Sequence, residues 1–380
     1  MTNLFVKVTT KNLSLALENL AFELRLKSKV VTPALLLILL IPKVSAQETA
    51  PPQEEFFEGR IETVLEENEN YQKLEILVTS GSLKDEKMMV EVGGEFQRVG
   101  EAKYKVGNEV VVSSFGYITD FVRRRPLVWL FVIFAALVLL IGRWWGLSSL
   151  LGMGFSFLII FKIILPQILA GRDPVLTTIL GSLLIIPATF YLSHGLNKKT
   201  TIAIAGTLIS LIIAGILSKI FVELTHLTGY ASEEAGFLQL MKGEVINIKG
   251  LLLAGIIIGV LGVLDDITIA QAVVVEQLRH TNPNLKPQEI FKKAMSIGQD
   301  HIASMVNTLV LVYAGASLPL LLLFVNNPHP LTKIVNYEII AEEIVRTLVG
   351  SIALILAVPI TTFLATLNPT PKVDRQNSKG

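Results

Sequence analysis

The sequence predicts an α-helical polytopic membrane protein, with about seven transmembrane helices and a small exported β-rich domain at its N-terminus. Hydrophobic residues make up 51% of the 380 residues and charged residues only 17%, and the apolar residues lie in blocks separated by short polar joints. The blocks after residue 121 are each close to the ~20 residues that a helix needs to cross a bilayer. Before them, residues 55–118 alternate between apolar and polar positions in short runs, which is typical of β-strands.

Residues 1–46 are predicted to be a signal peptide. Basic residues precede a short apolar core at residues 30–41, and Val44, Ser45 and Ala46 supply small residues before a cleavage site. An uncleaved anchor is the alternative, because Lys43 interrupts the end of the core. Either way, residue 47 and those after it would be exported, beginning with a Pro-containing linker at 47–54.

Residues 55–118 are predicted to form a small β domain, an OB-like barrel or a sandwich, because glycine-containing turns separate its short strands. A nucleic-acid-binding face would need basic and aromatic residues interleaved on the strands, whereas this segment is rich in Glu. Together with a formal net charge of only +1, this predicts no nucleic-acid partner.

Residues 121–367 are predicted to be the membrane domain, and residues 368–380 a disordered cytoplasmic tail. Seven spans after an exported domain place the C-terminus inside. Basic joints such as Lys198–Lys199 then agree with the positive-inside rule, but the cluster at residues 123–125 would lie outside, so the orientation depends mainly on the signal peptide. The predicted spans are residues 126–142, 146–170, 174–195, 200–222, 250–264, 302–324 and 348–367.

Residues 267–301 are predicted to be a cytoplasmic helical hairpin between the fifth and sixth spans. The first helix can continue to His280, the segment TNPN at 281–284 breaks it, and Pro287 fits the first turn of the next helix. Asp265 shares a helical face with Thr268, while Asp266 points about 100° away.

Polar side chains at both junctions of this hairpin are candidates for a transport path, because ionisable groups at membrane depth are costly and suggest function. The alternative is that Asp265 caps a break, that Asp300 faces cytoplasmic water, and that Asn307 and Thr308 only hydrogen-bond between helices. Glu233 and Glu234 are candidates for an outer mouth, or else form a solvated acid pair. The path candidates are Asp265, Asp266, Asp300, Ser304, Asn307 and Thr308.

No enzyme and no cofactor site are predicted. The chain has no cysteine, which excludes disulfides, thiol chemistry and Cys-ligated metals. It contains no P-loop lysine motif, no HExxH and no GxSxG, and His194, His226 and His329 are too far apart for ligand spacing. The sequence leaves open whether a metal ion binds.

Several ordered segments resemble the YibE/F family of bacterial multi-pass membrane proteins: HGLNKKTTIAIAGTL, GLLLAGIIIGVLGVLDD, the run from residue 282 to 324, and EEIVRTLVGSIALILAVPITTFLA. The resemblance covers roughly residues 121–367. In that family the end of the fifth span usually reads GALGAVMD, so the resemblance places the family's acidic residue on Asp265 or Asp266. The two adjacent acids here depart from that pattern. The family's IGxD, TNTL and SLPLLLLF elements fall on residues 297–300, 306–309 (here VNTL) and 317–324.

The resemblance implies a membrane permease or efflux component of unknown substrate, and the hairpin acids suggest coupling to an ion or a proton. A different class of function is a non-transporting structural or assembly protein whose exported β domain recruits an envelope partner. The expected partners are membrane lipid, a second copy of the chain, and a separate envelope protein or, for primary pumping, a separate ATPase.

Overall fold

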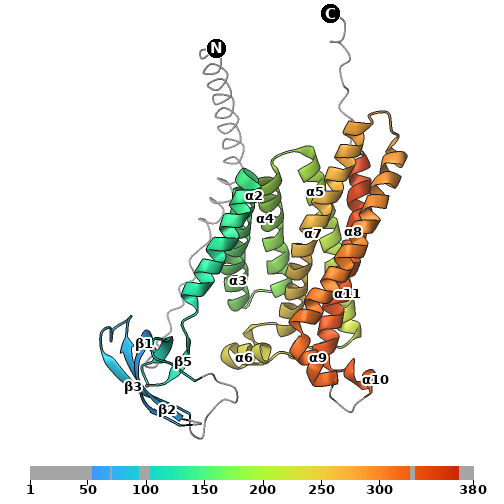
Figure 1. Ribbon diagram of the computed structural model, residues 1–380. Coiled ribbons are helices and arrows are strands. Elements are labelled where there is room, and N and C mark those ends of the chain that lie inside the picture. The colour runs from blue at the N-terminus through green and yellow to red at the C-terminus, as the bar shows by residue number, and fades with distance from the viewer. Residues whose placement is uncertain (1–53, 69–70, 94–102, 326–329, 368–380) are drawn as a thin grey trace, which may run out of the picture. The chain divides into compact units, whose positions relative to one another are not determined.

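The computed structural model describes residues 54–68, 71–93, 103–325 and 330–367. The predicted signal peptide, nearly all of the linker and the predicted tail lie outside these residues. Contacts divide the chain into a sheet unit within residues 42–141 and a helical unit that contains residues 142–380 (Figure 1).

The sheet unit contains one antiparallel sheet of five strands in the order β3-β2-β1-β4-β5. The β-rich prediction is confirmed for the residues that the structure describes, although the sequence did not predict β5. Residues 94–102 of the predicted domain lie outside the described residues. Two register shifts in β1 mark bulges, which bend a strand and increase its twist, and a partly open barrel needs such bends. The strands are β1 (Phe56–Glu67), β2 (Tyr71–Val78), β3 (Lys87–Gly93), β4 (Glu109–Ser113) and β5 (Ile118–Phe121).

One face of this sheet is its core, since alternate residues such as Ile61, Leu74 and Val110 are fully buried. The buried Gln72 amide exchanges two hydrogen bonds with the backbone of Tyr104, at 2.8 and 3.0 Å. Gly59 lies where β1 pairs with both β2 and β4, and a Cβ there would be 2.5 Å from Cγ2 of Ile76. Only glycine fits this position without displacing the core.

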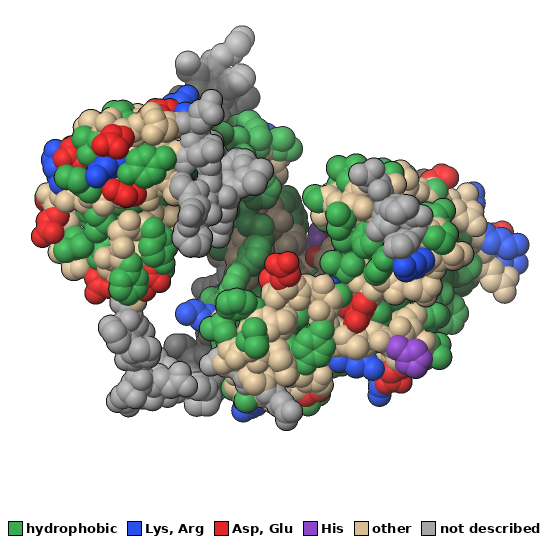
Figure 2. All heavy atoms as spheres, turned by 90° about the horizontal axis from the view of Figure 1, so that it is seen from below, with side chains coloured by type: hydrophobic (Ala, Val, Ile, Leu, Met, Phe, Trp, Pro, Cys, Tyr) green, Lys and Arg blue, Asp and Glu red, His purple; other side chains and the backbone are tan. Residues whose placement is uncertain are grey.

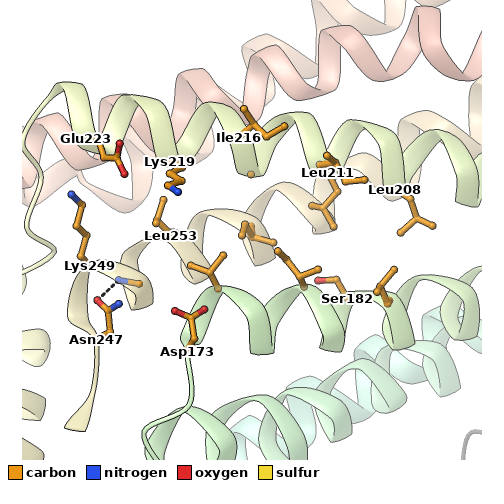
Figure 3. Close-up of a pocket in the computed structure, with 17 residues that line it drawn as sticks. Asp173, Ser182, Leu208, Leu211, Ile216, Lys219, Glu223, Asn247, Lys249 and Leu253 are labelled. Atoms are coloured by element: carbon orange, nitrogen blue, oxygen red, sulfur yellow. Dashed lines mark hydrogen bonds between the residues drawn. The ribbon is translucent and has the colours of Figure 1, made fainter. Parts of the chain in front are cut away.

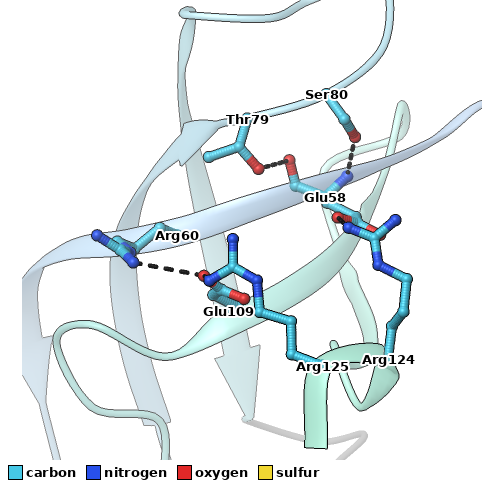
Figure 4. Close-up of polar contacts among 7 residues, drawn as sticks. All are labelled: Glu58, Arg60, Thr79, Ser80, Glu109, Arg124 and Arg125. Carbon is cyan, nitrogen blue, oxygen red and sulfur yellow. Dashed lines mark hydrogen bonds and ion pairs between the residues drawn. The ribbon is translucent and has the colours of Figure 1, made fainter. Parts of the chain in front are cut away.

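The arginines at residues 123–125 bind the sheet rather than remaining unpaired. Their pairs are exposed, so each adds little to stability, but together they explain a basic cluster in a sheet unit whose surface carries many acids (Figures 2 and 4). The pairs are Arg123 with Asp120 at 2.5 Å, Arg124 with Glu58 at 3.0 Å and Arg125 with Glu109 at 2.7 Å.

Several helices begin where a short polar side chain caps them. Asp173, Asn197 and Asn247 each accept a hydrogen bond from a backbone N–H three residues later, at 2.7–2.9 Å. The elements are α2 (Arg124–Ile159), η1 (Ile160–Ile164), α3 (Leu165–Leu169), α4 (Pro174–His194), α5 (Lys198–Leu224), α6 (Glu233–Lys242), η2 (Gly243–Val245), α7 (Ile248–Thr281), α8 (Pro287–Ala316), α9 (Leu318–Val325), α10 (Leu331–Ile334) and α11 (Glu338–Leu367).

Five helices in the described residues are long and apolar enough to cross a membrane, or six if α8 and α9, bent by 73°, form one span. The predicted count of seven is not confirmed, because the first two predicted spans fall in one run, Arg124–Leu169. Arg143, between those two spans, has non-helical angles (φ 48°, ψ −126°). The helix break before Pro287 lies where the sequence predicted it.

Helix α7 is central to the helical unit and packs on α4, α5, α8 and α11 (Figure 1). It runs antiparallel to α5 and α8, and parallel to α11. The core between these helices includes Ile256, Leu264 and Leu354, whose side chains are fully buried.

The close approach at Gly59 predicts a local effect on the sheet. Gly59→Val should lower the free energy of unfolding of the sheet unit by about 1–3 kcal/mol, because the added atoms overpack against Ile76. The measurement is the temperature at which protease cleaves the sheet in the full-length protein. Thr63→Val, an exposed change on the same strand, is the control. Equal cleavage temperatures for both variants would contradict the assignment.

Candidate functional site

Asp265 and Asp266 lie near the middle of a long uncharged stretch of α7. The helix is about 51 Å long, from 34 residues at 1.5 Å each. Between Lys249 and Glu276 these two acids are its only charged residues. The sequence had placed them at the end of a span. The stretch without charged residues extends beyond the acids to Glu276. Its polar residues there, Thr268 and Gln271, are fully buried and hydrogen-bonded to neighbouring helices.

The two neighbouring carboxylates have different surroundings. Asp265 is partly buried, and its Oδ1 is shielded from solvent with no hydrogen-bond partner among the described residues. Asp266 is exposed. The difference follows from the ~100° turn between successive helical residues, which directs one side chain into the bundle and the next away from it.

Asp265 lies on the face of α7 that packs against α5. Thr268, one turn further, is fully buried, and its hydroxyl lies 2.7 Å from that of Thr207. At the end of the same face, Glu276 pairs with Lys199 at 2.8 Å. In both pairs the two residue numbers sum to the same value, as they must when antiparallel helices pack without a change in register.

The same register places Ser210 of α5 at the level of Asp265. Ser210 is fully buried, and its Oγ has no hydrogen-bond partner among the residues that the structure describes. Two facing helices therefore present an unsatisfied carboxylate oxygen and an unsatisfied hydroxyl at one depth. Such a pair can accept a proton, a water molecule or a small cation, since each supplies the missing contact.

Closer to the end of α7, the helices α7, α8 and α11 pack tightly around Gln271. Its Nε2 donates to the carbonyl oxygen of Ala294 and to Oγ1 of Thr362, both at 2.8 Å. Gly298, which belongs to the IGxD element, lets α8 come this close: a Cβ there would be 2.5 Å from Cγ1 of Val358. The buried amide therefore links three helices.

The polar residues of α8 do not join this site. Asp300, Ser304, Asn307 and Thr308 are all exposed, and the hydroxyl of Thr308 donates to the carbonyl of Ser304 in its own helix at 2.9 Å. The buried residues of α8, such as Ala294 and Gly298, lie on the side of the helix away from Asp300 and Asn307. Within one chain, the structure does not bring these side chains together with Asp265.

The outer-mouth candidates Glu233 and Glu234 are exposed in the first turn of α6. Ser232 caps this helix, since its hydroxyl oxygen accepts a hydrogen bond from the N–H of Ala235 at 3.2 Å. Acids in a first turn stabilise a helix through its dipole, which accounts for both without a further role.

A second buried acid was not predicted. Glu342 of α11 is 7% exposed, and its Oε1 has no hydrogen-bond partner among the described residues. One turn later, Arg346 pairs with Glu343 at 3.4 Å and approaches Gly255 of α7. The sequence prediction began the last span at residue 348, so these residues were left outside it. Arg346 follows Glu343 by three residues and Glu342 by four, the spacing of side chains that are neighbours on a helix, and this spacing was the available sequence signal.

The packing around Gln271 predicts opposite effects for the same substitution at two glycines. Gly298→Ala should lower the thermal unfolding midpoint, since the methyl group would displace Val358 or the Gln271 amide. The methyl group of Gly262→Ala on α7 meets no atom within 4 Å. This variant should leave the midpoint unchanged or raise it, because alanine stabilises a helix relative to glycine by at most about 1 kcal/mol. A midpoint for Gly298→Ala at or above wild type would contradict the close packing.

Comparisons with known proteins agree with the resemblance seen in the sequence. A family model described as YibE/F-like protein matches residues 130–370, from within α2 to the end of α11, and therefore includes Asp265, Gln271 and Glu342. No curated protein and no solved structure matches the chain. The apolar helices and the family together indicate a membrane protein. Since the match spans more than half of the sequence, the chain belongs to the YibE/F-like protein family.

Proposed function

We propose that this protein is a multi-pass membrane permease, not an enzyme, in which Asp265 binds and releases a proton or a monovalent cation as the substrate moves. The single observation that carries this proposal is the Asp265 carboxylate in the middle of α7, one oxygen of which is buried and has no hydrogen-bond partner among the residues that the structure describes.

The proposal follows from the cost of charge in a bilayer. An ionised carboxylate within the hydrocarbon is unfavourable by several kcal/mol unless something neutralises or hydrates it. Asp265 has no basic partner in an ion pair among the described residues. A bound proton or cation would neutralise it, and the nearby hydroxyls of Ser210, Thr207 and Thr268 would add neutral oxygen contacts.

Polar groups on both sides of Asp265 suggest how an ion would reach it. Toward the start of α7, Glu342 and Arg346 lie within the bundle near Gly255. Toward its end, the Lys199–Glu276 pair ends the α5 face. With the sheet unit outside and the C-terminus inside, ions would enter past Glu342 and leave past Glu276, with Asp265 as the intermediate site.

A structural or assembly role is the second candidate, favoured by exposed apolar side chains on the sheet unit. Met89 on β3 is 65% exposed and Phe115, in the turn before β5, is 70% exposed. An envelope partner could cover them. In this role the helices would hold the sheet at the membrane and Asp265 would have no ion to bind.

Ion flux into proteoliposomes tests the first proposal. Dyes for H⁺, Na⁺ and K⁺ inside the vesicles would report uptake driven by an imposed gradient. We expect wild-type protein to carry one of these ions and Asp265→Asn to reduce its flux to that of empty liposomes, because the amide neither ionises nor exchanges a proton.

Asp266→Asn is the matched control, since it removes the same charge one residue away from an exposed position. It should retain most of the flux. Equal loss in both variants, at equal amounts of folded protein, would contradict the role of Asp265. No flux of any of the three ions through wild type would contradict the permease and favour the assembly role.

A further inference from the structure

A pocket of about 700 Å³ opens between α4, α5 and α7, within the range of small-molecule sites. It ends at Ile257 on α7, two turns before Asp265, and shares no residue with the site described above. Figure 3 shows its charged side chains gathered at one end and apolar side chains along the rest.

The charged end of the pocket lies at the ends of the three helices. Asp173 caps α4, Glu223 is one residue from the end of α5, and Lys249 is the second residue of α7. Lys219, one turn before Glu223 on α5, completes the group. Helix ends of a membrane bundle lie at the depth of lipid head groups, so the pocket presents two cations and two anions at that depth.

Most of the charged groups at this end of the pocket have no ion-pair partner among the described residues. Neither lysine nor Glu223 forms an ion pair within the described part of the chain. Asp173 uses one oxygen to cap α4, through the N–H of Leu176 at 2.7 Å, and its side chain is otherwise exposed. Figure 3 shows Glu223 and Lys249 facing one another from α5 and α7.

The remainder of the pocket is apolar and open to the side. Ile179 and Leu183 of α4 and Ile212 and Ile216 of α5 line it and are also exposed, which would let a hydrocarbon chain enter from the bilayer. Deep in the pocket Ser182 is 1% exposed, and its Oγ has no hydrogen-bond partner among the described residues. Its hydroxyl points from α4 into the space (Figure 3), where a ligand oxygen would satisfy it.

We propose that this pocket binds a zwitterionic phospholipid, with an ammonium-bearing head group at the charged end and an acyl chain in the apolar part. Lys219 and Lys249 would contact the phosphate, and Glu223 and Asp173 the ammonium group. Both signs of charge, adjacent and unpaired, fit a zwitterion better than a purely anionic head group.

The test is a titration of the delipidated full-length protein with phosphatidylethanolamine in detergent, followed by native mass spectrometry. We expect one lipid per chain. Phosphatidylglycerol, which lacks the ammonium group, should bind about tenfold more weakly, because it cannot donate hydrogen bonds from an ammonium group to Glu223 and Asp173. Free phosphoethanolamine should not compete, because it lacks the chain.

Two variants separate the parts of the pocket. Gly215 lines it, and a Cβ there meets no atom within 4 Å, so Gly215→Leu places a side chain in the pocket and should abolish binding. Gly262→Leu, at an equally open glycine outside the pocket, should bind as wild type does. The double variant Lys219→Gln, Lys249→Gln should weaken binding of both lipids, whereas Lys198→Gln at the other end of α5 should not.

Further variants address the ammonium group. Glu223→Gln with Asp173→Asn, which retains a capping oxygen on α4, should remove the preference for phosphatidylethanolamine over phosphatidylglycerol. Undiminished binding to Gly215→Leu would overturn the proposal. So would equal binding of the two lipids by wild type, or competition by phosphoethanolamine alone, which would identify a site for a soluble zwitterion. None of these results depends on ion flux through Asp265.

Discussion

Helix α7 is held against its neighbours by polar side chains that it carries through the bundle. A polar group without a partner costs several kcal/mol where no water reaches it. Thr268, Gln271 and Glu276 each contact a polar group of α5, α8 or α11. These contacts fix the register of α7 against its neighbours, and Asp265 lies within that register without a full set of partners. Oε1 of Gln271 also lacks a hydrogen-bond partner among the described residues, so Asp265 is distinguished by carrying an ionisable group at this position.

Different depths of the helical unit present different chemistry. At the start of α7, Lys249 lies with Asp173, Lys219 and Glu223 near the ends of three helices, and the last three are exposed. In the middle, Asp265 lies at the level of the hydroxyls of Ser210 and Thr268, with the exposed Asp266 beside it. A single cation or proton suits the middle, and a larger zwitterion suits the end. The two proposed sites follow from this difference, and each can fail without the other.

The sequence predicted those features that depend on local pattern. The β-rich segment, the helix break before Pro287, and the shared face of Asp265 and Thr268 all follow from periodicity and turn residues. What it could not predict is the direction in which a face points. Asp300 and Asn307 form a polar stripe in the sequence, but Ala294 and Gly298 permit closer packing, and α8 buries that opposite side instead. Such a choice depends on neighbours that are distant in the chain, as does the unpredicted burial of Glu342.

The most direct test of the central claim is chemical labelling by a hydrophobic carbodiimide, which reacts with protonated carboxyl groups in apolar surroundings. The full-length protein in lipid vesicles would be labelled over a range of pH and the modified residue identified by mass spectrometry. The account predicts that Asp265 is labelled and Asp266 is not, that labelling decreases as the pH rises, and that a coupling cation protects Asp265. Labelling of Asp266 in preference to Asp265, or no labelling of Asp265 at any pH, would contradict it.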